Sequence, residues 1–157
     1  MNEDKEKFLI SLDNAKKYLQ TVDHLVYVTF PLIKEQRLLL KALEELQNAL
    51  INIINSILQY EAYNKKIIIS KNAEENFNIF KKIAPTYSIS LNQLEKIIEI
   101  LKITEKHKKS PFEFIKDGKI VIMGDNFETE ILSIEKIKEY IIETKDFLRK
   151  VRTKINS

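Results

Sequence analysis

Cysteine is absent from the 157 residues, and glycine and proline are scarce, with two and three residues respectively. Without cysteine the chain has no disulfide framework, no thiolate metal site and no cysteine nucleophile. Two glycines are too few for a phosphate-binding glycine loop. Because so few residues break helices, the composition favours long helices over many short strands.

Histidine is nearly absent too, since His24 and His107 are the two in the chain. Neither has a second histidine or a glutamate at the helical spacing that metal ligands need. Ser110 follows His107 closely, but the sequence offers this pair no orienting acid and no oxyanion hole. We therefore predict no catalytic residue, no metal site and no cofactor, and an enzyme is the third choice of function.

Long apolar runs are missing as well, because no stretch approaches the roughly 20 apolar residues that span a bilayer. The first residues, MNEDKEKF, are polar and do not resemble a signal peptide. The net charge of +3 is modest for a dedicated nucleic-acid-binding protein. We expect a cytoplasmic protein with no membrane partner.

Helical periodicity dominates the first two thirds of the chain. Apolar residues alternate at spacings of four and three through a long helical hairpin, residues 3–63, and shorter helices follow within residues 73–106. Pro31 interrupts the hairpin, and we read it as the start of the second helix, with a kinked continuous helix as the alternative. Residues 65–72 are either a short strand or the frayed end of that helix.

The stretch from Glu105 to Asn126 breaks this pattern. Asp117-Gly118 between two β-forming runs predicts a hairpin in which residues 114–116 pair with residues 119–121, and residues 129–132 form a possible third strand. The β-region, residues 112–132, precedes a C-terminal helix, residues 133–155. The predicted fold is a mainly α-helical bundle of about five helices, a single domain over residues 1–157, with a small β-hairpin inserted before the last helix. Four apolar hairpin residues are expected to pack on the bundle: Phe112, Phe114, Ile120 and Ile122.

The widest apolar stripe lies on the second long helix. Its length and its broad apolar face suggest that it needs a partner, so we predict a homodimer or a helical protein partner. The predicted interface residues are Leu39, Leu43, Leu46, Leu50, Ile53 and Ile57.

Basic residues gather in two places and support an alternative, in which RNA binds through phosphate contacts. The competing interpretation is that these basic residues lie near helix C-termini because the helix dipole favours cations there. The first group lies along the C-terminal helix at Lys138, Lys145, Arg149 and Arg152. The second group lies before the hairpin at His107, Lys108 and Lys109.

Five carboxylates surround the hairpin. They suit either acid–base and metal chemistry or, as we favour, turns and charged strand edges that discourage aggregation. They are Glu113, Asp117, Asp125, Glu128 and Glu130.

The AKKYL and LLLKALEELQNALINII segments, with a shorter helical second half, resemble the HEPN helical-bundle domains. Members of that family are often dimers, and many are RNases or partners of nucleotidyltransferases. The RNase members need a histidine five to seven positions after an arginine, and Arg37, Arg149 and Arg152 lack one. The HKKSPFEF segment is similar to part of small uncharacterised archaeal proteins. The sequence thus predicts a non-enzymatic interaction or scaffold module, with RNA binding as the alternative.

Overall fold

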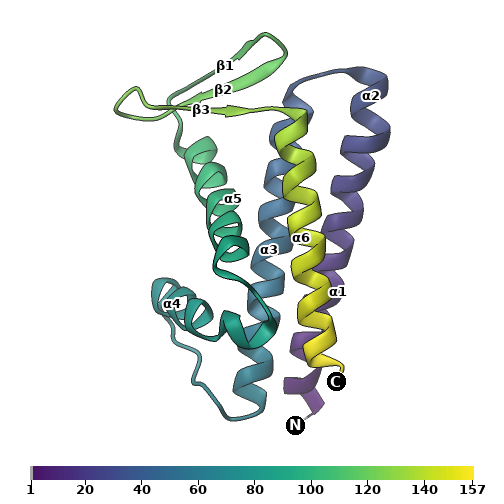
Figure 1. Ribbon diagram of the computed structural model, residues 1–157, viewed down its shortest axis with the longest axis vertical. Helices are drawn as coiled ribbons and strands as arrows, with labels where there is room; N and C mark the ends of the chain where they lie inside the picture. The colour runs from purple at the N-terminus through teal and green to yellow at the C-terminus, as the bar shows by residue number, and fades with distance from the viewer. Residues whose placement is uncertain (1) are drawn as a thin grey trace.

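A computed structural model describes residues 2–157, and it confirms a mainly helical bundle with a small antiparallel sheet before the last helix (Figure 1). Counting α1, η1 and α2 as one continuous rod, the bundle has five helical segments. The helical elements are α1 (Asn2–His24), the π-helical turn η1 (Leu25–Thr29), α2 (Phe30–Ile33), α3 (Arg37–Tyr63), α4 (Ala73–Ile83), the 3-10 turn η2 (Ala84–Tyr87), α5 (Leu91–Lys109) and α6 (Ile134–Ile155).

Pro31 does not begin the second long helix, and that prediction was wrong. The first helix continues through η1, where the Phe30 amide donates to the Leu25 carbonyl five residues back. Pro31 sits in the last helical turn, and Lys34 ends it with a left-handed φ of 56°. Because a proline removes one helical N–H and crowds the turn before it, a wider π-turn lets the helix pass the ring. The helix does continue across Pro31, but it ends at Ile33, so the alternative of one kinked helix through both segments is not met either.

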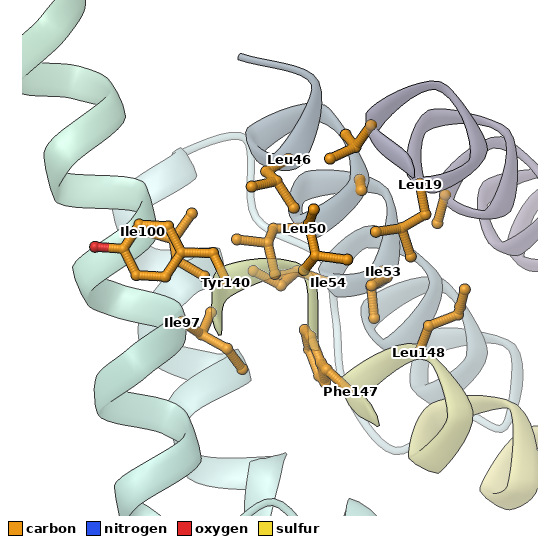
Figure 2. Packing of buried hydrophobic residues seen from close by; sticks show 14 of the residues in the cluster. Leu19, Leu46, Leu50, Ile53, Ile54, Ile97, Ile100, Tyr140, Phe147 and Leu148 are labelled. Carbon is orange, nitrogen blue, oxygen red and sulfur yellow. The ribbon is translucent and has the colours of Figure 1, made fainter. Parts of the chain in front are cut away.

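The core forms where α1, α3, α5 and α6 meet. In Figure 2, Leu50 of α3 lies between Leu19 of α1 and Ile100 of α5, and all three side chains belong to one buried cluster. Two large α6 side chains that periodicity alone did not single out, Tyr140 and Phe147, are fully buried in the same cluster. A single apolar core therefore holds the helices together and also reaches the sheet.

Local capping residues determine where the two middle helices, α4 and α5, begin. Residues 65–72 form neither a strand nor a helix, and Asn72 then caps α4 by accepting from the Glu75 amide. Ser90 caps α5 by accepting from the Gln93 amide, as its capping signature predicted. The helix it opens runs to Lys109, three residues past the predicted end. This extension matters because it carries His107 and its neighbours up to the sheet.

The sheet has the order β1 (Phe112–Lys116), β2 (Lys119–Met123), β3 (Thr129–Leu132), and both strand pairs are antiparallel. The predicted hairpin register is confirmed, because Phe114 pairs with Val121 and Lys116 with Lys119. Asp117 and Gly118 both have positive φ, 53° and 72°, as a two-residue primed turn requires.

Two of the four hairpin side chains expected in the core are there, since Ile120 and Ile122 are buried. Phe114 is half-buried. Phe112 is 57% exposed, so its predicted packing on the bundle was wrong. It lies at the start of an edge strand, where its ring contacts that of Phe114 at a centroid distance of 5.5 Å.

Ser133 caps α6 by accepting from the Lys136 amide. From there α6 runs back along the bundle, so both ends of the described chain, residues 2 and 157, lie at the end of the molecule opposite the sheet (Figure 1). Within residues 2–157, no helix is both long and apolar enough to span a bilayer.

Candidate functional site

The predicted partner interface on α3 is corrected by the structure. All six of its residues are at most 1% exposed in the single chain, because α1, α5 and α6 cover the stripe from within the same molecule. A surface that is already inside the core cannot receive a partner without unfolding. The residues concerned are Leu39, Leu43, Leu46, Leu50, Ile53 and Ile57.

The basic residues of α6 share one flank of the helix, as predicted, but two of them already have acidic partners. Lys145 Nζ lies 2.7 Å from Asp23 Oδ2 on α1, and Arg149 Nη2 lies 2.7 Å from Asp146 Oδ1. The Lys138 ammonium lies over the Tyr27 ring at 5.5 Å. Such pairs reduce the positive charge that is free to meet a phosphate.

Near the C-terminal end of α6, the basic residues do converge. Lys145, Arg149 and Arg152 line a shallow hollow of about 320 Å³ together with Leu148 and Thr153. All its lining residues belong to α6 and its C-cap, so the hollow is an open stretch of one helix surface that carries three cationic side chains.

The second basic group is built into the fold rather than held free. His107 lies near the end of α5, between one carboxylate on α3 and one on β1: its Nδ1 is 2.7 Å from Glu113 Oε2 and its Nε2 is 3.1 Å from Glu44 Oε1. The ring is 14% exposed. A neutral imidazole could donate to one carboxylate only, whereas the imidazolium donates to both. The site therefore fits the charged form.

Burial alone would lower the pKa of His107, because it penalises the cation. The hydrogen bonds and charges of Glu113 and Glu44 act the other way and outweigh burial, so the pKa lies above its ordinary value. His107 thus joins α3, α5 and β1 most strongly when it is protonated.

Neighbouring residues join the same elements. Lys108 Nζ donates to Gln47 Oε1 of α3 at 2.5 Å, and Gln47 Nε2 donates to Glu105 Oε1 at 3.2 Å. Ser110 Oγ donates to the Met123 carbonyl at 2.6 Å and so ties the end of α5 to β2. Lys109 is exposed and lies 3.9 Å from Glu105. Of the predicted RNA-binding group, His107 therefore belongs to a junction between the sheet and the bundle, whereas Lys108 and Lys109 remain exposed.

Exposed apolar side chains occur on two elements at this end of the molecule. Leu32 and Ile33 of α2 are 80% and 63% exposed, and Phe112 and Ile115 of β1 are 57% and 49% exposed. Figure 1 places α2 and the hairpin at the same end of the molecule. We call these four residues, with the groove described next, the sheet-end surface.

A groove of about 280 Å³ lies between the start of α3 and the hairpin. Leu40, Phe114 and Ile120 give it apolar walls, and Arg37 and Glu113 place opposite charges at its edge. Ile115 lines the groove, and Phe112 contacts Phe114 in its wall. Leu32 and Ile33 lie on α2, which ends shortly before Arg37 in the chain. Exposed apolar patches rimmed by polar residues mark interaction sites or ligand-binding grooves.

The hairpin carboxylates do not converge on one point. Glu113 binds His107, Glu128 lies 3.8 Å from Lys106, and Glu128 also accepts from the Asn126 amide. Within residues 2–157, no three histidine or carboxylate side chains are placed to hold a metal ion. Turn chemistry therefore accounts for Glu128, whereas Glu113 belongs to the His107 junction.

Sequence reasoning missed Glu44 and the groove. Glu44 lies 63 residues from His107 and carries no local signal of its partner. The exposed Leu32 and Ile33 could have been noticed, because they fall at the chain reversal outside both apolar stripes. No family model matches the chain, and neither a curated protein nor a solved structure matches it significantly.

Proposed function

We propose that the protein is a non-enzymatic interaction module that self-associates through the sheet-end surface. The observation that carries this proposal is that the surface holds both protruding apolar side chains and an apolar hollow. In a two-fold dimer the same patch of each copy faces the other. Phe112 or Leu32 of one copy can then occupy the groove of the other, and Arg37 of each can face Glu113 of the other.

The first prediction tests this interface. Phe112→Glu combined with Leu32→Glu should convert a dimer into a monomer, because each copy then brings two charges into an apolar contact. Light scattering after size-exclusion chromatography measures the mass. Ile10→Glu is the matched control, because Ile10 on α1 is also 57% exposed and lies far from the sheet. A wild-type monomer at all concentrations, or a control that dissociates equally, would contradict the proposal.

RNA binding stays a second proposal, supported by the hollow that Lys145, Arg149 and Arg152 line. This proposal now rests on fewer residues than the sequence predicted, because His107 is held between two carboxylates and Lys108, although exposed, donates to Gln47.

The second prediction concerns this hollow. Under the RNA proposal, Arg149→Glu with Arg152→Glu should abolish binding to a single-stranded RNA, and wild-type affinity should fall steeply as salt rises. Fluorescence anisotropy of a labelled oligonucleotide measures both effects. Lys116→Glu with Lys119→Glu changes the net charge equally at the hairpin turn and should leave binding intact. Wild-type binding that does not depend on salt would rule the proposal out.

A further inference from the structure

β1 and β3 form the two edges of the sheet, because β2 lies between them. A strand at an edge presents unpaired backbone N–H and C=O groups, and proteins usually cover or interrupt such edges. The β3 edge has a cover of this kind, since Lys136 Nζ donates to the Ile131 carbonyl at 3.3 Å. The edge of β3 is therefore partly closed by its own chain.

The register of the hairpin determines which backbone groups of β1 point outward. Lys116 and Lys119 close the two-residue turn, and the closing pair of such a hairpin exchanges backbone hydrogen bonds. Hydrogen-bonded pairs alternate along an antiparallel ladder, so the N–H and C=O groups of Glu113 and Ile115 point away from β2. Within residues 2–157, these groups have no other backbone partner. The edge of β1 therefore offers two donors and two acceptors to a further strand.

The side chains of β1 leave this edge open. Charged side chains often discourage pairing at an edge, but the Glu113 carboxylate is turned to His107, with 2.7 Å between Oε2 and Nδ1. Lys116 stands at the end of the strand, beside the turn. Between the two charges lie Phe114 and Ile115, and Ile115 is 49% exposed. The middle of β1 thus combines free backbone groups with apolar side chains.

We propose that β1 pairs antiparallel with β1 of a second copy, so that the two three-stranded sheets join into one sheet of six strands. This inference rests on the self-association proposed above and adds how the two copies meet. A two-fold axis perpendicular to the sheet places the same strand of each copy against the other. When the axis passes through Phe114, Glu113 pairs with Ile115 of the second copy, and these are the residues whose backbone groups are free.

The side chains favour this register over its neighbours. An axis through Glu113 would set two glutamates directly opposite each other, which is destabilising. An axis through Ile115 would place Glu113 opposite the turn and leave its backbone groups unpaired. With the axis at Phe114, the two Phe114 rings meet as an aromatic pair, and the Phe112 ring lies opposite Lys116 of the second copy, where a cation–π contact can form. The strand is therefore complementary to itself in this register.

Disulfide crosslinking of the full chain tests the register, because a chain without cysteine gives no background. In Phe114→Cys the two thiols face each other in a non-hydrogen-bonded pair, where opposite side chains are closest. Mild oxidation followed by a non-reducing gel should show a linked dimer. Phe112→Cys is the matched control on the same strand. Its two thiols lie four residues apart along the ladder, about 13 Å, and should not link.

A proline at Ile115 tests the backbone contact itself. Ile115→Pro removes an outward N–H that the β1–β2 ladder does not use, so the hairpin can persist while the edge loses a donor. Light scattering should show a monomer for this variant. Ile115→Val is the matched control, because valine keeps the N–H group and the preference for strands, and it should remain a dimer. The crosslinking result does not depend on whether the proline variant folds.

The outcomes separate this inference from the self-association on which it rests. A linked dimer in Phe114→Cys but not in Phe112→Cys, with a monomeric Ile115→Pro, supports strand pairing. A dimeric wild type in which Phe114→Cys does not link, or links no better than Phe112→Cys, would overturn the pairing and leave the sheet-end contact standing. A folded Ile115→Pro that stays dimeric would do the same. A monomeric wild type at all concentrations would overturn both.

Discussion

At the scale of single residues, His107 is the side chain whose charge state most affects the structure. Its ring links α3 and β1 through Glu44 and Glu113, and both bonds are satisfied only when it is protonated. Because its folded pKa is raised, the stability it contributes is fully present below the unfolded value of about 6.5. That stability is lost as the pH rises through the folded pKa.

The third prediction follows from the direction of this pH dependence. His107→Gln should lower the free energy of unfolding by about 1 kcal/mol below pH 6.5, and the difference from wild type should disappear at alkaline pH. Urea unfolding at a series of pH values measures it. His24→Gln is the control, because the His24 ring is exposed and contacts Thr29 Oγ1. A difference that grows with pH would contradict the assignment.

Residue-level prediction from sequence succeeded where the partners are near in the chain. Ser90 and Ser133 cap helices three residues ahead, and such signals are complete within one turn. The His107–Glu44 contact and the full burial of Tyr140 depend on how separate elements pack. No local pattern could therefore have identified them.

At the scale of elements, the hairpin was predictable because its turn requires a backbone conformation that few residues adopt. Gly118 has a φ of 72°, and a Cβ there would meet nothing within 4 Å. Replacement by an L-residue would therefore cost conformational energy without a clash.

The fourth prediction is that Gly118→Ala lowers the free energy of unfolding by about 1 kcal/mol, the cost of placing alanine at positive φ. Asp117→Gly is the matched control at the other turn position, where φ is also positive, and should change stability less. Chemical denaturation measures both variants. Equal stability of wild type and Gly118→Ala would show that the turn is not held in this conformation.

The first helix shows where element-level reasoning failed. Proline is common in the first turn of a helix, so Pro31 suggested a start. The chain instead widens into a π-turn and reverses three residues later at Lys34. The preference of proline for the first turn of a helix reflects the geometry of proline itself. Whether the turn before a proline can widen into a π-turn depends on how that turn packs in the folded protein.

At the scale of the whole molecule, the apolar stripe of α3 shows what periodicity does not distinguish. Apolar residues that alternate at spacings of four and three predict that a helix packs on other helices. The spacing is the same whether those helices belong to the same chain or to another chain. The stripe was correctly read as buried and wrongly assigned to a partner, because this chain supplies its own covering helices.

The fifth prediction separates the two roles. Leu50→Ala should lower the free energy of unfolding by about 3 kcal/mol, the usual cost of a large-to-small change in a core, without changing the oligomeric mass. Denaturation and light scattering on the same sample measure the two quantities. Leu91→Ala, at a 73% exposed position on α5, is the control and should leave both the unfolding energy and the mass nearly unchanged. A change of oligomeric mass in Leu50→Ala would indicate that the apolar stripe of α3 does form part of an interface between copies.

Both chain ends lie away from the sheet, and this has a practical consequence for measuring the proposed contacts. A fluorescent label, an affinity tag or a surface linker can be attached at either terminus without covering the hairpin. A chain tethered to a sensor surface by its C-terminus would present the sheet end to solution. Copies tethered far apart should then capture free chain, whereas copies tethered densely should already be paired and capture less.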